Sequence, residues 1–436
     1  MSVAATELKS VRDSPYANLF FKDEEGKIGS VYHEGFKTLG WNGLTEKPLN
    51  RTHCDGSNKL IIATYKPEVS FDFMVHTSLE IKLHKLKLKP EFIGKYRFRY
   101  VDDLEYKISP SAVLRTDKVL ISNLDTYSQL VLNTKLTHSG HNNNISKTLT
   151  EWSYDFIKDD EIYPIQKWYY GNHPGKAFPL YRLENPSDVY HVYDFDLRTY
   201  RLIIVQNFDE SILEWKEVDN KKLEGMNLFE NSDKIGMLEI PTMYGMFSNM
   251  TDEERAERKD LNTFYIEDMI NCDPPESSKL KPDSVTSRTT DMCVGLVQAF
   301  FWSAENITYG DYNITCNYTI DKYPTRDSKA AIKSSTMIVN SMSKFENLPS
   351  KLFEGPIGTK HFYQTSKRKG IMGFPLVQEF DRGNNGGSCP QKNGTKLAFT
   401  LESCPSKEYR FVVRMRALSV KKMIIDEKGN LSIEPF

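Results

Sequence analysis

Apolar and polar residues alternate along much of the chain with a period of two. In Val69–Val75 every second residue is apolar. In Glu408–Val420 the arginines Arg410, Arg414 and Arg416 fall opposite an apolar row. A period of two places successive side chains on opposite faces of a strand. The pattern predicts β-strands that bury one face.

Other tracts of the same character recur at short intervals. The alternation slips by one position between Leu83 and Leu86, which predicts a bulge or bend. A closing hairpin is expected at Lys421–Ile425 and Leu431–Ile433. The remaining predicted strands are 59–65, 79–83, 96–104, 113–120, 127–136, 200–206, 293–303, 312–320, 336–340, 371–378 and 396–401.

One short segment interrupts this pattern with a clear helix start. Thr251 can cap the first turn, and Glu254 stands at the spacing of a capping box. Asp252 adds negative charge at the helix N-terminus, and Arg255 follows where the helix dipole tolerates a cation. Because this helix is highly polar, it can bury little surface. We therefore expect it at a rim between two β-rich halves.

The strand count and the length together predict the fold class. A chain of 436 residues is too long for one ordinary core. Many short strands, few short helices and long loops predict an all-β protein with two tandem β-sandwiches. The eight-stranded jelly roll is one such sandwich. We expect an N-terminal arm at 1–54, a first jelly roll at 55–235 and a second at 236–436.

Two readings of the arm remain open, a contact with a neighbouring molecule and a partly ordered tail. A tripeptide, Phe-Pro-Leu, occurs at Phe178–Leu180 and again at Phe374–Leu376. Because proline removes a ladder donor, it favours a strand start or a sheet edge. We therefore expect the two tripeptides to mark equivalent corners of two similar sandwiches.

Charge and cysteine content narrow the function classes. A net charge of −2 gives no general attraction to nucleic acid or to anionic membranes. The six cysteines contain no CxxC pair, which favours free thiols in a reducing compartment. No apolar run is long enough for a signal peptide or a membrane span, so we expect a protein made inside the cell.

Several segments together resemble, in order, the double-jelly-roll major capsid proteins of nucleocytoplasmic large DNA viruses, Polinton-like viruses and virophages. The resemblance runs from about Lys59 to Phe436, and the chain departs from the best-known members in its short length and its turn Gly383–Pro390. The segments are Trp168–Tyr170, Gly175–Leu180, Val189–Val192, Tyr200–Val205, Met250–Arg255, Phe264–Glu267, Val297–Trp302, Thr336–Asn340, His361–Tyr363, Gly370–Leu376 and Gly386–Cys389.

This resemblance implies a structural subunit without enzymatic activity. It implies a homotrimer of pseudo-hexagonal outline that tiles an icosahedral shell, made in the host cytoplasm and located in the virion. Implied partners are neighbouring capsomers, penton and minor capsid proteins and, in many members, an internal membrane. Sequence-specific binding of nucleic acid is not implied. Two alternatives remain: a tandem β-sandwich carbohydrate-binding protein or glycosidase, and a non-icosahedral viral scaffold of the same fold.

Clusters of acidic residues are the only sequence feature that favours the glycosidase alternative. A glycosidase needs two carboxylates about 5–10 Å apart in a cleft. Adjacency in Asp102–Asp103 and Asp159–Glu161 does not provide that arrangement, so solvated turns are the better interpretation. Asp194 and Asp196 share a strand face, but no metal ligand accompanies them.

Other motifs also fall short of a site. His138 and His141 share a polar loop without further zinc ligands. Gly383–Gly387 is followed by Ser-Cys-Pro, where a phosphate loop needs Lys-Ser/Thr and a helix. We therefore assign no catalytic, cofactor-binding or metal-ligating residue.

Overall fold

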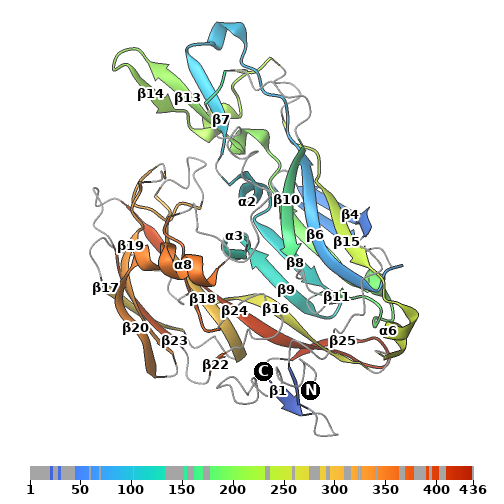
Figure 1. Cartoon of the computed structure of the whole chain (residues 1–436). Coiled ribbons are helices and arrows are strands. Elements are labelled where there is room, and N and C mark those ends of the chain that lie inside the picture. The colour runs from blue at the N-terminus through green and yellow to red at the C-terminus, as the bar shows by residue number, and fades with distance from the viewer. Residues whose placement is uncertain are drawn as a thin grey trace.

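The structure is a computed structural model with two β-sandwiches side by side (Figure 1). It describes residues 20–22, 28–30, 45–57, 60–67, 70–101, 103–132, 152–154, 162–169, 177–230, 236–257, 261–273, 285–290, 295–308, 316–322, 324, 327–339, 341–362, 369–377, 389–391, 395–401 and 409–434.

The first sandwich consists of two antiparallel sheets. One sheet has the order β10-β6-β15-β3, and β11 also pairs with β6. The other has the order β4-β5-β12-β8-β9. Their bounds are β3 (Thr45–Pro48), β4 (Asn50–Ser57), β5 (Leu60–Lys66), β6 (Phe73–Lys82), β8 (Ser111–Arg115), β9 (Leu120–Asp125), β10 (Ile162–Tyr169), β11 (Phe178–Pro179), β12 (Tyr190–Phe195) and β15 (Thr242–Ser248).

The second sandwich repeats this plan. One sheet has the order β16-β24-β18-β21, with β22 on β18 and β25 on β24, and the other has the order β17-β23-β19-β20. Their bounds are β16 (Thr263–Asn271), β17 (Val285–Thr290), β18 (Gly295–Asn306), β19 (Ile332–Val339), β20 (Met342–Pro349), β21 (Met372–Pro375), β22 (Cys389–Gln391), β23 (Thr395–Leu401), β24 (Phe411–Ile425) and β25 (Leu431–Glu434).

Each sandwich is an eight-stranded jelly roll. The chain visits the strand positions of the two sheets in the same order in both sandwiches. In the first roll the order is β3, β5, β6, β8, β9, β10 with β11, β12 and β15. In the second it is β16, β17, β18, β19, β20, β21 with β22, β23 and β24. The expected fold class, two tandem eight-stranded jelly rolls, is confirmed.

A three-stranded sheet, which we call the tower, projects from the first roll. Its order is β14 (Glu214–Glu217), β13 (Ile203–Asp209) and β7 (Tyr96–Tyr100). It lies at the end of the molecule opposite β22 and β25 (Figure 1). Two short strands near the N-terminus, β1 (Phe20–Lys22) and β2 (Ile28–Ser30), form a separate hairpin.

The helices are short and lie between strands. The helix expected near residue 252 is α6, and its described side chains, Asp252, Arg255 and Ala256, are exposed at the rim of the first roll (Figure 1). The other helices are α2 (Leu104–Ile108), α3 (Thr126–Val131), α5 (Asn220–Leu223), α7 (Ser350–Glu354) and α8 (Pro356–His361), with the 3₁₀ turns η2 (Pro90–Phe92), η5 (Pro186–Asp188) and η6 (Thr199–Arg201).

The two rolls share one irregularity, a β-bulge at the same place in the ladder. β6 bulges at Val75, opposite Met246 and Phe247. β18 bulges at Gln298, between the partners of Leu418 and Ser419. Bulges are structural features that locally re-aim a strand. The bulges therefore provide a register in which the two rolls can be compared position by position.

A hydrogen bond beyond the ladder confirms this register. Counted from the bulges, Met243 corresponds to Met415 and Leu49 to Cys272. The N–H of Leu49 donates to the carbonyl of Met243 at 2.7 Å, and the N–H of Cys272 donates to the carbonyl of Met415 at 3.0 Å. The same backbone bond therefore occurs in both rolls.

The same register shows that our prediction for the two Phe-Pro-Leu tripeptides is wrong. Pro179 pairs with Phe73, and the position that corresponds to Phe73 in the second roll is Leu296. The partner of Leu296 is Pro390, not Pro375. Pro375 lies opposite Ala299, which is three residues further along β18. Both tripeptides lie on the same sheet edge, but they are not equivalent corners.

The strand pairing also corrects the limits expected for the first roll, 55 and 235. β3 begins at Thr45 and β4 at Asn50, inside the expected arm 1–54. β15 begins at Thr242, inside the expected second roll 236–436, yet it pairs with β6 and β3. Hydrogen bonding between strands distant in sequence decides membership, so we place the division between Ser248 and Thr263.

One expected strand is a helix. The alternation at 127–136 predicts a strand, but α3 occupies Thr126–Val131. Asp125 precedes it in extended conformation, and its carboxylate accepts a hydrogen bond from the Ser128 N–H at 2.8 Å. This N-cap stabilises the first turn, and buried Tyr127 and Leu130 anchor it. Local capping and tertiary contact thus outweigh the period-two pattern.

Candidate functional site: the junction between the two sandwiches

The clearest buried polar feature among the described residues is Arg416, whose side chain is fully buried. It lies on β24, opposite Asn271 of β16 and Phe301 of β18. Phe301 and Leu418 belong to the apolar cluster that contains the first-roll core, whereas Phe300 belongs to the inner core of the second roll. Arg416 therefore lies on the sheet face that packs against the first roll.

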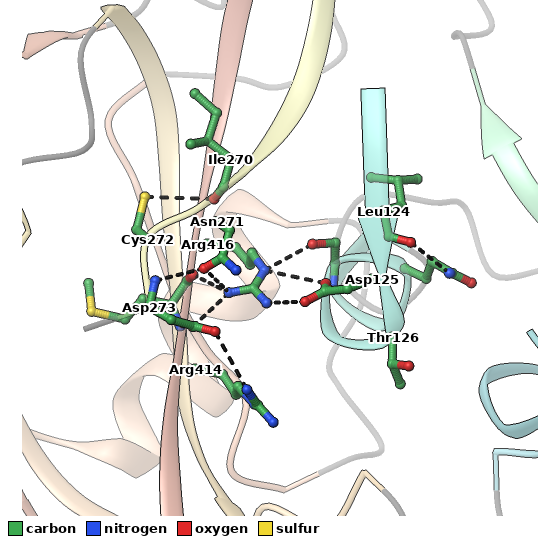
Figure 2. Close-up of polar contacts among 12 residues, drawn as sticks. Leu124, Asp125, Thr126, Ile270, Asn271, Cys272, Asp273, Arg414 and Arg416 are labelled. Atoms are coloured by element: carbon green, nitrogen blue, oxygen red, sulfur yellow. Dashed lines mark hydrogen bonds and ion pairs between the residues drawn. The ribbon is translucent and has the colours of Figure 1, made fainter. Parts of the chain in front are cut away.

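Acidic and polar partners from both rolls surround this guanidinium (Figure 2). From the first roll, the Asp125 carboxylate pairs with it, and Ser128 Oγ accepts from Nε at 2.9 Å. From the second roll, Asp273 Oδ1 accepts from Nη1 at 2.7 Å and Asn271 Oδ1 accepts at 3.0 Å. A buried charge is tolerated only with such partners. We call these five side chains the junction network.

The start of α3 supplies the first-roll half of the network. Asp125 caps the helix, so its carboxylate lies where the helix dipole and the free N–H groups favour a negative charge. Burial raises the pKa of Asp125, but the Arg416 charge and hydrogen bonds from Arg416 and Ser128 outweigh burial and hold the pKa below its usual range. The carboxylate therefore stays ionised at neutral pH.

The second-roll half also neutralises Arg416. Burial lowers the pKa of Arg416, while the charges of Asp125 and Asp273 raise it above its ordinary value. Asp273 also accepts the backbone N–H of Met415 at 2.7 Å and lies 3.6 Å from Arg414. One arginine thus binds a loop of its own roll and a helix of the other.

Further contacts extend the junction on both sides of the network. Asp268 of β16, which is buried, pairs with Lys421 and accepts from the Ser122 hydroxyl of β9. Lys322 lies 3.1 Å from Glu217, which ties β14 of the tower to the second roll. Aromatic contacts join Tyr127 to Tyr318 and Tyr181 to Phe264, with centroids 5.6 Å and 6.3 Å apart.

Such a junction joins the two rolls through buried polar contacts. Asp125 and Asp273 both pair with Arg416, and the apolar contacts of the junction are continuous with the first-roll core. Because Asp125 accepts from the guanidinium through both carboxylate oxygens, the geometry of this contact is also directional. The arrangement is that of a rigid structural joint.

The described residues that the sequence offered as catalytic or metal-binding candidates do not belong to the junction network. Asp196 binds Arg198 at 2.6 Å and Arg201 at 3.4 Å. Asp194 lies on the outer face of β12, and Asp103 precedes α2 in the left-handed region. The remaining candidates, Asp102, Asp159–Glu161, His138, His141 and Gly383–Gly387, lie outside the described residues.

Within the described ranges no group of three or more His, Cys, Asp or Glu side chains could hold a metal ion. Within the same ranges no helix is long and apolar enough to cross a membrane. Cys54 is exposed, Cys272 and Cys316 are buried, and these three cysteines are free thiols.

The sequence pattern did not single out Arg416. It placed Arg410, Arg414 and Arg416 together on one strand face, but the structure exposes Arg410, partly buries Arg414 and fully buries Arg416. The available signal was the capping spacing of Asp125 and Ser128, which marks a helix start inside an expected strand region.

The sequence matches no protein-family model and no curated protein. Solved structures match the fold over nearly the whole chain. The PBCV-1 virus capsid, a quasi-atomic structure, matches with a TM-score of 0.60 at 11% identity, covering 91% of this chain and 99% of that one.

Two further structures agree. The Faustovirus major capsid protein gives a TM-score of 0.60 at 8% identity, covering 97% of this chain and 98% of its own. The Sputnik virophage structure gives 0.53 at 10% identity, covering 91% and 89%. The double-jelly-roll fold expected from the sequence resemblance is thereby confirmed.

Proposed function

We propose that the protein is a major capsid protein, a structural subunit of an icosahedral virion. The observation that carries the proposal is the pair of jelly rolls in one chain, matched over 91% and 97% of its length by two capsid structures rather than over one sandwich alone. Because fold alone does not determine function, assembly is the property to test.

The geometry of the chain suits a trimer. Two similar rolls held rigidly side by side form two of six similar sides, so three copies related by a three-fold axis give a pseudo-hexagonal outline. The fully buried Arg416 at the junction resists bending between the rolls. A rigid pseudo-hexagon packs in a lattice with neighbouring capsomers, and penton and minor capsid proteins would complete the shell.

The shape of the chain supports one orientation of the subunit in the shell. The tower projects from one end, and β1, β22 and β25 lie at the other (Figure 1). We orient the tower outward, the opposite end inward, and the strands roughly perpendicular to the shell. The inner end then faces the genome or an internal membrane. Synthesis in the host cytoplasm and location in the virion follow from this role.

Sedimentation and negative-stain electron microscopy of the purified protein test the proposal. The expected result is a trimer at micromolar concentration whose particles have a pseudo-hexagonal outline. A well-behaved monomer, or filaments without such an outline, would contradict it. A hydrolase screen and a glycan array test the carbohydrate alternative, for which we expect no activity and no binding.

A further inference from the structure

The junction inside the chain shows which two surfaces of a roll fit each other. The first roll contributes the end of β9 and the start of α3. The second roll contributes the outer face of the sheet that contains β16, β24 and β18, with Arg416 projecting from it. One roll presents a helix end, and the other presents a sheet face.

The second roll also has a helix end like the one that the first roll contributes to the junction. The first roll also has a sheet face like the one that the second roll contributes. In the second roll α7 follows β20 directly, as α3 follows β9 in the first. Pro349 stands at the N-cap position of α7, where Asp125 stands in α3. In the first roll β3, β15 and β6 correspond to β16, β24 and β18. These counterparts do not meet within the chain.

Tyr244 holds the ladder position of Arg416. Counted from the bulges, it pairs with Pro48 and Ser78, as Arg416 pairs with Asn271 and Phe301. Tyr244 and Ser78 are half-buried, whereas Arg416 is fully covered by the first roll. The sheet face around Tyr244 is therefore the face that, in the second roll, is closed by a neighbouring helix end.

The two unused surfaces lie on opposite sides of the molecule. β15 lies on the right in Figure 1, and β20 and α8 lie on the left. A contact between different surfaces of identical copies is head-to-tail, and it forms a ring if its rotation closes. The internal junction joins the helix end of the first roll to the sheet face of the second. A contact between the helix end of this second roll and the sheet face of the first roll in another copy would repeat that arrangement in the same direction.

The charges of the two surfaces are complementary. Glu46 and Glu80 share the outer face with Tyr244, because their ladder partners, Met246 and Thr242, lie two residues from Tyr244 on β15. The charge of Glu80, followed by burial, raises the pKa of Tyr244. The start of α7 has exposed Lys351 beside half-exposed Leu352. At the internal junction the sheet carries the cation, Arg416, and the helix end carries the acid, Asp125. At the contact between copies the sheet would carry the acids and the start of α7 the cation.

We propose that the start of α7 in one copy packs against the outer face of β3, β15 and β6 in the next copy, with Tyr244 at the centre. This inference rests on the proposed trimer and assigns its interface. It names a second copy of this chain as the occupant of both surfaces, because the internal junction shows how a helix end and this kind of sheet face fit together.

The test transfers the internal ion pair to the proposed interface. Tyr244→Arg places a cation where Arg416 stands in the other roll. Pro349→Asp places an acid at the N-cap of α7, where no side chain caps the helix, so this variant is expected to fold. The double variant recreates the pair. Ile62→Arg, on the exposed outer face of β5, is the matched control.

Trimer dissociation constants come from sedimentation over a concentration series, and circular dichroism checks folding. Each single variant is expected to weaken the trimer at least about tenfold, because its new charge faces charges of the same sign in the other copy: Tyr244→Arg faces Lys351, and Pro349→Asp faces Glu46 and Glu80. The double variant is expected to recover most of that loss, and the control to leave the constant unchanged.

The outcomes separate the two proposals. If the unmodified chain is trimeric and the single variants dissociate no more readily than the control, the assigned interface is wrong and the trimer stands. If both singles weaken the trimer and the double variant gives no recovery, the two surfaces do not face each other and the inference also fails. If the unmodified chain is a monomer, the proposed trimer fails, and the inference with it.

Discussion

Replacing Arg416 with methionine tests whether the junction network holds the two rolls together. Methionine keeps much of the length and apolar stem of arginine, so packing changes little, while the charge and all guanidinium hydrogen bonds are lost. Asp125 and Asp273 then lose their shared cation at a contact that buries the guanidinium completely.

The expected loss follows from what remains behind. Breaking a buried ion pair by removing one partner costs about 3–5 kcal/mol, because the other charge is left uncompensated. Here the Asp125 side chain is 47% exposed and that of Asp273 is 18% exposed, so water can rehydrate part of both. We therefore expect a loss of roughly 2–4 kcal/mol in the free energy of unfolding.

Scanning calorimetry measures the effect. For a cooperative unit of 150–250 residues, 1 kcal/mol lowers the melting temperature by about 2–4 °C, so the expected decrease is between about 4 and 16 °C. Arg416→Lys keeps the charge without the planar fork and should lose less. Because the chain has two rolls, the transition is also expected to split when the joint weakens.

Arg414→Met is the matched control, two residues away on the same strand. Arg414 is 33% exposed and pairs with Glu305 at 2.8 Å, so solvent screens much of its interaction. We expect a loss of about 1 kcal/mol or less. Equal losses from the two substitutions, or a single unshifted transition in Arg416→Met, would show that burial of Arg416 does not set the strength of the junction.

Three further outcomes are expected. The pKa of Asp125 is lower in the folded than in the unfolded state, so its pairing with Arg416 stabilises the fold at pH values above the unfolded pKa. This stabilisation is lost as the pH falls through the folded pKa. The free energy of unfolding should therefore fall less steeply with acid in Arg416→Met, and an unchanged pH profile would contradict this. Unfolding midpoints with and without reductant should agree, because the described cysteines are free, and a large drop on reduction would show an unrecognised disulfide. Gly370→Ala should destabilise the fold by more than Gly94→Ala in calorimetry, although both glycines have φ above +80°. A Cβ at Gly370 would meet the Tyr318 carbonyl oxygen, whereas Gly94 has open space. Equal losses would mean that the close approach at Gly370 relaxes freely.

The sequence alone predicted the fold class, because the alternation of apolar and polar residues is a local signal that survives in each strand. Strand β5 begins and ends within one residue of its predicted tract, whereas β6 and β24 each join two tracts that were predicted separately. The helix near residue 252 was predicted from its cap and charges, which act within one turn. The ordered segments of the resemblance added the jelly-roll topology, which alternation does not specify.

Other features were decided by tertiary structure, because their causes lie far apart in the chain. Alternation says that a strand has two faces, but not which sheet it joins, so β15 was assigned to the wrong roll until its pairing with β6 was known. The equivalence of Pro179 with Pro390 depends on ladder register, which a repeated tripeptide does not reveal.

The junction network shows the limit most clearly. Arg416 and Asp125 are 291 residues apart, and each has an ordinary local explanation, as a polar strand residue and as a helix cap. An arginine on a polar strand face reads as solvated, since nothing in its neighbours shows that a second sandwich covers that face. The sequence by itself determined two jelly rolls, and the packing of one against the other decided which polar side chains are buried between them.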